Sequence, residues 1–136
     1  MIGHPQKYER HSTVPIDVVL HAVAEAPTRV SINGQVVKVG SLRLRTFLEH
    51  GIKCVACGLE GSYFALERTS GPHGGPSTCP YHVNLWGVDR GGNERLLTHD
   101  HILARGLGGK DHISNTQTMC AACNQTKART ENMEFK

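Results

Sequence analysis

The chain has 136 residues with only three Phe, three Tyr and one Trp, so it has room for one domain with a thin apolar core. Its net charge of +3 is compatible with a polyanionic partner but does not identify one. No apolar run approaches the length of a membrane span, and the amino-terminal segment lacks the apolar core of a signal peptide. We therefore expect a cytoplasmic protein with no membrane partner, in a compartment where thiols stay reduced.

The first part of the chain is predicted to contain a helix and a hairpin after a polar arm. We expect residues 1–14 to form this arm and to be poorly ordered. A helix that ends before Pro27 is predicted next, because apolar residues recur at helical spacing, at Ile16, Val19, Leu20 and Val23. Residues 29–39 are predicted to form a hairpin, because Asn33-Gly34 lies between alternating apolar residues.

A second helix is predicted to begin after the capping residue Ser41 and to stop at Gly51. Its buried side is expected to carry Leu44, Phe47 and Leu48. Arg43 and Arg45 flank this apolar stripe, and their face is either simply solvated or in contact with phosphate. We favour the docking role.

The remaining residues are predicted to form strands followed by a final helix. A tight turn is expected at 54–58, a Gly- and Pro-rich loop at 70–80 and another loop at 106–114. Strands are expected at 62–69, 81–88, 94–101 and 116–119, and the helix at 121 to about 129. The predicted fold is small α+β, with a helix–hairpin–helix extension over residues 1–51 and a second domain over residues 52–136.

Four of the five cysteines fall into two Cys-x-x-Cys pairs, Cys54 with Cys57 and Cys120 with Cys123, which leaves Cys79 over. Two such pairs on either side of a hairpin are typical of a structural zinc ion held by four thiolates. The alternative is a set of buried thiols without a metal. We favour zinc, because a bound metal would compensate for the thin apolar core.

A second group of metal-binding and proton-transfer residues lies near the end of the chain. Asp100 and His101 are adjacent on a predicted strand, so their side chains should point to opposite faces. Asp100 and Asn124 would offer two oxygen ligands to Mg²⁺ or Mn²⁺ and leave room for water and phosphate. His101 would supply a base near neutral pH. The plainer alternatives are a structural histidine and a helix-capping asparagine.

These residues resemble the HNH, or ββα-metal, endonucleases. The resemblance covers about residues 54–129, and the chain looks most like the small phage-type members. Asn115 and Asn124 follow His101 by 14 and 23 positions, which is the spacing in the family. Ala104 departs from the pattern, since the family often has Pro there, and this should change loop stiffness and not chemistry. The matching motifs are Asp100-His101-Ile102, Gly108-Gly109, Asn115 and Cys120-x-x-Cys123-Asn124-x-x-Lys127.

The resemblance implies a divalent-metal-dependent DNA endonuclease that nicks or cuts both strands. Its catalytic ion would be Mg²⁺ or Mn²⁺, and Zn²⁺ would be structural. His101 would be the general base, and Asp100 and Asn124 would be the metal ligands. Asn115 would brace the loop between the strands. Contacts to DNA are expected from six residues: Lys127, Arg105, Lys110, His99, Arg43 and Arg45.

Two alternatives from other classes stay open. A non-catalytic, zinc-dependent nucleic-acid-binding module would keep the four cysteines but would need neither Asp100 and His101 nor Asn124. A structure-specific or RNA-directed nuclease would use the same site with a different docking surface. The sequence specifies neither the target nor the oligomeric state.

Overall fold

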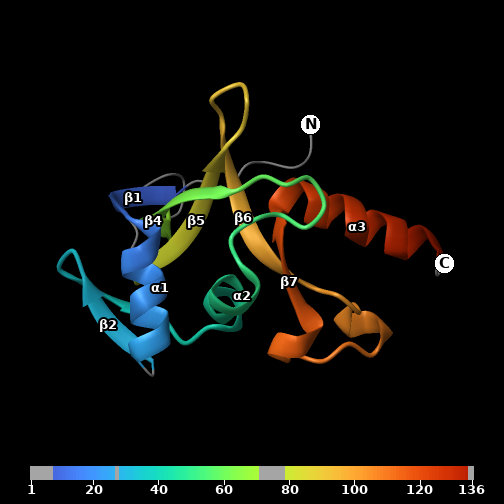
Figure 1. Cartoon of the computed structure of the whole chain (residues 1–136), viewed down its shortest axis with the longest axis horizontal. Helices are drawn as coiled ribbons and strands as arrows, with labels where there is room; N and C mark the ends of the chain where they lie inside the picture. Colours follow the sequence, from blue (N-terminus) through green and yellow to red (C-terminus); the bar gives the residue numbers. More distant parts are fainter. Residues whose placement is uncertain (1–7, 27, 71–78, 135–136) are drawn as a thin grey trace.

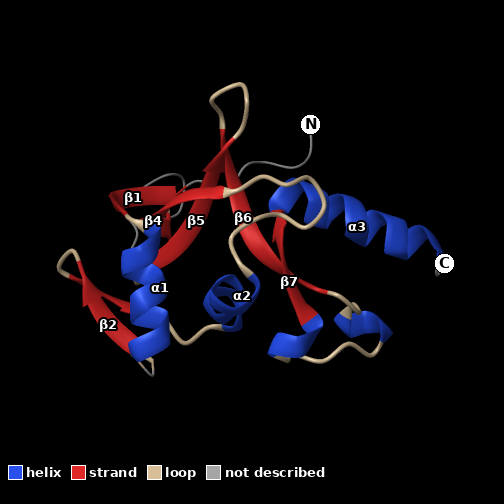
Figure 2. Ribbon diagram, in the orientation of Figure 1, coloured by secondary structure: helices blue, strands red, loops and turns tan. Residues whose placement is uncertain are grey.

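The computed structural model of the chain describes residues 8–26, 28–70 and 79–134, and it confirms the predicted α+β class (Figures 1 and 2). The helices are α1 (Ile16–Glu25), α2 (Leu42–His50) and α3 (Ala121–Glu134). The strands are β1 (Tyr8–Val14), β2 (Arg29–Ile32), β3 (Gln35–Lys38), β4 (Gly61–Thr69), β5 (His82–Val88), β6 (Glu94–His101) and β7 (Thr116–Cys120). Two short 3-10 turns, η2 (Arg105–Leu107) and η3 (Ile113–Asn115), lie between β6 and β7.

The main sheet is antiparallel, with five strands in the order β1-β4-β5-β6-β7. The strands β2 and β3 form a separate hairpin. In Figure 1, α1 and this hairpin lie at one end of the molecule, and α3 lies at the other. The unit made of β6, β7 and α3 therefore forms one edge of the sheet and carries the predicted catalytic residues.

The strand β1 corrects the expectation of a poorly ordered arm, of which residues 1–7 lie outside the described part of the chain. β1 pairs with β4 at the sheet edge, and its last residue, Val14, is buried. The polar and charged side chains of this segment predict exposure to solvent. In the fold, Arg10 forms ion pairs with carboxylates on other strands of the sheet, at 2.8 Å from Glu67 and 2.9 Å from Glu94.

The helix α1 and the β2–β3 hairpin follow the prediction closely. Val19 and Val23 give α1 its buried side. Asn33 and Gly34 both have positive φ, at 51° and 79°, which is the backbone conformation of the tight turns that suit hairpin twist.

The helix α2 also forms as predicted, except for the direction of one apolar residue. The Ser41 hydroxyl accepts a hydrogen bond from the Leu44 amide, and Gly51 ends the helix with a φ of 94°. Leu48 was expected to be buried but is 37% exposed. Thr46 lies on the buried side, where its hydroxyl donates to Thr116 on β7 at 2.8 Å, and this polar contact sets the rotation of the helix.

One apolar core joins the predicted extension to the rest of the chain. Val14, Val19 and Phe47 from the first 51 residues belong to the same buried cluster as Phe64 and Leu85. The helix α2 packs directly against β6 and β7. The boundary expected after residue 51 therefore falls within a shared core, and α2 supports the strands that carry the candidate site.

Candidate active site and thiol cluster

The four paired cysteines converge in space, and their sulfur atoms all lie within 4.8 Å of one another. Cys57 Sγ and Cys120 Sγ are 3.8 Å apart. Zinc–thiolate bonds of about 2.3 Å in a tetrahedron require sulfur separations of about 3.8 Å, so the cluster has the dimensions of a four-thiolate zinc site. The cluster does not include Cys79.

Backbone hydrogen bonds hold the first cysteine pair against the second. The Cys54 amide donates to the Leu59 carbonyl, and the Gly58 amide donates to the Cys54 carbonyl. The Val55 amide donates to the carbonyl of Thr118 on β7, at 3.0 Å. The turn at 54–58 is therefore fixed beside the strand that leads into Cys120.

The protein environment favours loss of a proton from one thiol in particular. Burial raises the pKa of Cys54, but hydrogen bonds from the backbone of Cys120, Cys57 and Ala56 outweigh it and lower the pKa to about 6. Burial raises the pKa of Cys120 and that of Cys123. Cys54 is thus the thiol that most readily becomes the thiolate needed for metal binding.

A separate cavity of about 240 Å³ gathers most of the predicted catalytic residues. Asp100 and His101 both reach it, although neighbours on a regular strand should face opposite sides. Both can do so because β6 ends at His101, where the chain leaves the sheet. The lining consists of His99, Asp100, His101, Ala104, Arg105, Asn124, Ala128 and Glu131.

Asp100 is the buried anion of this cavity, with only 7% of its surface exposed. Its Oδ2 atom accepts a hydrogen bond from Gln117 Nε2 at 2.9 Å and lies 3.3 Å from the ammonium nitrogen of Lys127. Both contacts are made by Oδ2, so among the described residues they leave the other carboxylate oxygen available to a cation. A cation in the cavity would meet a negative charge that is already held in place.

His101 is oriented by a residue that the sequence analysis missed. Its Nε2 atom donates to Asp111 Oδ1 at 2.6 Å, and Arg105 Nε lies 3.5 Å from the same oxygen. A carboxylate can only accept, so this contact places a proton on Nε2 and leaves Nδ1 as the basic nitrogen. No spacing rule indicated Asp111, because it lies in an irregular loop.

The helix α3 presents three polar side chains to the end of β6. Asn124 Nδ2 donates to the His99 carbonyl at 3.4 Å, which leaves its amide oxygen for another partner. Lys127 Nζ donates to the His101 carbonyl at 3.0 Å and lies 3.3 Å from Glu131. Glu131 was not predicted from the sequence, although its position seven residues after Asn124 indicates the same helical face.

Asn115 closes the loop between β6 and β7. Its side-chain oxygen accepts from the Leu103 amide at 2.9 Å, and its nitrogen donates to the carbonyls of Leu103 and Lys110 at 3.0 Å. A side chain at Gly109 would collide with the Leu103 carbonyl, so glycine is required there by close packing. These contacts fix the loop that supplies Asp111.

The predicted cationic contacts do not form one surface. Arg105 lines the cavity, whereas the exposed Lys110 does not. Arg43 and Arg45 point in different directions, because residues two apart on a helix do not share a face. Arg43 Nη2 donates to the Val83 carbonyl at 2.9 Å, and Arg45 is exposed to solvent.

His99 lies at the boundary of the cavity, with its ring 5.5 Å from that of His101. Burial, followed by electrostatic interactions with His101 and Arg43, lowers its pKa. Its Nδ1 atom is buried and has no hydrogen-bond partner within the described part of the chain. His99 is therefore a neutral imidazole with one nitrogen unused.

Comparison with known proteins matches residues 90–136 to the family model of the HNH endonucleases. The predicted resemblance is thereby confirmed for this segment, which contains β6, β7 and α3 and which we call the HNH region. The searches of curated proteins and of solved structures gave no match. Cys54 and Cys57 lie outside the matched segment. Among the described residues, no helix combines the length and apolar character needed to cross a membrane.

Proposed function

We propose that the chain is a divalent-metal-dependent endonuclease that hydrolyses phosphodiester bonds in DNA, by nicking or by cutting both strands. The observation that carries this proposal is the single cavity lined by Asp100, His101 and Asn124 within the HNH region. A carboxylate, an amide oxygen and an imidazole are the groups needed to hold a hard cation and to move a proton.

The donor set fits Mg²⁺ or Mn²⁺. Asp100 offers a buried carboxylate and Asn124 a neutral oxygen, and such ions commonly keep several waters beside few protein ligands. When bound, a divalent ion stabilises the negative charge that develops on the phosphate and on the leaving oxygen. Lys127, which lies 3.3 Å from Asp100, would then turn towards Glu131 or the phosphate.

His101 is the proposed general base. Its Nε2–H group donates to Asp111, so the lone pair on Nδ1 is free to take a proton from the attacking water. Asp111 holds the ring in this tautomer, as a carboxylate does in other His-based sites. Asn115 keeps the loop that carries Asp111 closed against Leu103.

We propose that the four-cysteine cluster holds a structural Zn²⁺ ion. All four ligand positions are filled by sulfur, which leaves no open position for a substrate. The ion would link the turn at 54–58 to the start of α3. It would therefore fix Asn124, the residue that follows Cys123, relative to β6.

Cleavage of supercoiled plasmid DNA, with and without added Mg²⁺, tests the proposal. His101→Ala should lower the rate by on the order of 10²–10⁴-fold, the usual contribution of a general base, yet should bind Mg²⁺ normally in calorimetry. Asp100→Ala should stop cleavage and also weaken Mg²⁺ binding, because it removes the anionic ligand. Asn124→Ala, which removes a neutral ligand, should recover part of its activity in Mn²⁺.

His21→Ala is the matched control, since His21 is an exposed histidine on α1 far along the chain from the cavity. Wild-type activity in His101→Ala would eliminate His101 as the base. Poor Mg²⁺ binding by His101→Ala together with normal binding by Asp100→Ala would reverse the two roles. If the chain cleaved RNA and not DNA, the proposed substrate would be wrong, but the proposed roles of the metal and of His101 in hydrolysis would stand.

A further inference from the structure

Two more cavities adjoin the catalytic cavity and continue it towards the β2–β3 hairpin. The first has a volume of about 340 Å³ and shares His99 with the catalytic cavity. The second has a volume of about 360 Å³ and shares Lys38 and Ser41 with the first. The three hollows therefore lie in series, each sharing lining residues with the next. We call the two outer hollows the basic groove, and its polar lining consists of His99, His82, Arg43, Ser41, Lys38 and Arg29.

Arg43, in the middle of the basic groove, is a charged side chain with little compensation. Within the described part of the chain, its only hydrogen bond is the one to the Val83 carbonyl, and it forms no ion pair. Burial lowers the pKa of Arg43, yet a guanidinium remains charged at neutral pH. A partly buried cation without an anion is costly unless a ligand supplies the negative charge.

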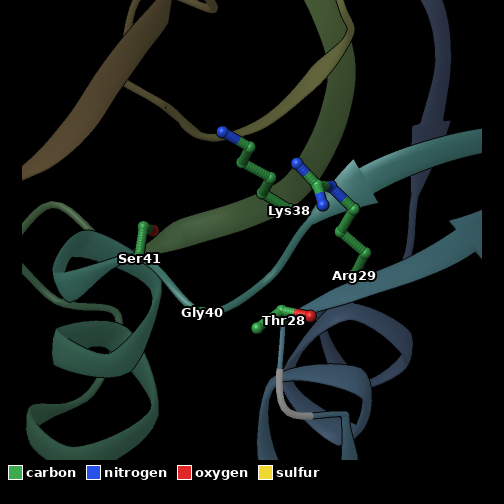
Figure 3. Close-up of a pocket in the computed structure, with 5 residues that line it drawn as sticks. All are labelled: Thr28, Arg29, Lys38, Gly40 and Ser41. Carbon is green, nitrogen blue, oxygen red and sulfur yellow. The ribbon is translucent and has the colours of Figure 1, made fainter.

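The outer end of the basic groove also carries positive side chains that no carboxylate neutralises among the described residues. Arg29 and Lys38 are direct partners in the register of β2 and β3, and like charges in such a pair destabilise a hairpin. Figure 3 shows both side chains extending from the hairpin beside Gly40 and Ser41. Both residues are exposed and form no ion pair among the residues that the structure describes.

The field in the groove is positive along its length. Partial burial and the positive charges of Arg43 and Lys38 lower the pKa of His82, which lines the same hollow. Among the described residues, the lining of the two outer cavities contains no Asp or Glu. A negatively charged chain would therefore meet attraction over the whole path from His99 to Arg29.

We infer that the basic groove binds the sugar-phosphate backbone of one DNA strand as it leaves the catalytic cavity, with Arg43, Lys38 and Arg29 in contact with successive phosphates. This inference rests on the proposed function. A strand is a better fit than a small anion, because the cationic lining extends through two successive hollows beside the catalytic cavity. Apart from His99, the residues that line the groove lie outside the matched HNH region.

The test measures binding of the full chain to a fluorescein-labelled DNA duplex by anisotropy at a series of NaCl concentrations. All proteins carry His101→Ala, so that DNA stays intact without a chelator that could remove the structural metal. Arg29→Ala with Lys38→Ala should weaken binding and reduce the slope of log affinity against log salt by about 1.8, the value for two lost phosphate contacts. Arg43→Gln should reduce it by about 0.9.

Lys53→Ala with Arg90→Ala is the matched control, because it removes two exposed cationic side chains that do not line the groove. This control should leave the salt slope near that of the parent protein. Equal slopes for the Arg29/Lys38 pair and the Lys53/Arg90 pair would overturn the inference. Because binding is read without cleavage, a wild-type chain that binds through the groove but cuts nothing would refute the proposed nuclease and leave the groove supported.

Discussion

Asp111 accepts a hydrogen bond from the ring of His101, and this contact can be tested by a single substitution. Asp111→Asn should lower the rate of plasmid cleavage by up to about 10⁴-fold, the loss that the same change causes in a Ser-His-Asp triad, because the amide no longer selects the tautomer with a proton on Nε2. Binding of Mg²⁺ in calorimetry should not change, since Asp111 is not a proposed ligand.

Asp17→Asn is the control for this substitution, since Asp17 is an exposed aspartate on α1. A rate for Asp111→Asn equal to that of the control would mean that the His101–Asp111 contact has no catalytic part.

At the level of single residues, the sequence identified the candidate site residues that can be recognised by their spacing along the chain. Asp100 and His101 end a strand and Asn124 lies early in a helix, so the three could be expected to meet. The direction of Arg43 depends on how α2 packs beside β5, where its guanidinium meets the Val83 carbonyl. The contact of Asp111 depends on an irregular loop. No periodic pattern encodes either arrangement.

Among the elements, the turn at 54–58 is predicted to be held by zinc. Cys57→Ser should remove one of four sulfur ligands, so the purified protein should contain well under one zinc per chain and unfold at a lower temperature. Elemental analysis and thermal unfolding followed by circular dichroism measure both effects. Cys79→Ser should leave zinc content and stability unchanged, because Cys79 lies outside the cluster. A folded and active Cys57→Ser protein without zinc would contradict the prediction.

The elements that the sequence predicted best are those with a strong local signal. Asn33-Gly34 defined one hairpin, and Ser41 with Gly51 defined α2. β1 was missed because its charges are compensated by Glu67 and Glu94, which lie far along the chain. The helix α3 continues beyond the expected end near residue 129, to Glu134, because no glycine or proline interrupts it.

The whole molecule is predicted to need its first 51 residues in order to fold. The fragment 52–136 would lose eight buried apolar residues, and at about 2 kcal/mol each their burial contributes about 16 kcal/mol, which is at least as large as the stability of a typical domain. The fragment should therefore elute as an aggregate or give an unfolded circular dichroism spectrum, even with zinc. A monomeric, folded fragment would support an independent domain. The eight residues are Val14, Val19, Val23, Ile32, Val37, Val39, Leu44 and Phe47.

For the whole molecule, the class of fold followed from the sequence but the packing did not. The alternation of strands and helices predicted α+β. It could not show that α2 packs on β6 and β7, because that contact depends on Thr46 meeting Thr116 across 70 positions.

The wide separation of the two cysteine pairs has a consequence for the order of folding. Cys57 and Cys120 are 63 positions apart, and closing a loop of that length in an unfolded chain costs roughly 4 kcal/mol of entropy. Hairpin pairing of β4 through β7 shortens this path one step at a time. We therefore expect metal capture to be the last event of maturation, visible as a zinc-dependent final phase in refolding. The concentration of available zinc would then determine how many chains reach the mature state. The rate at which the sheet forms would not depend on zinc.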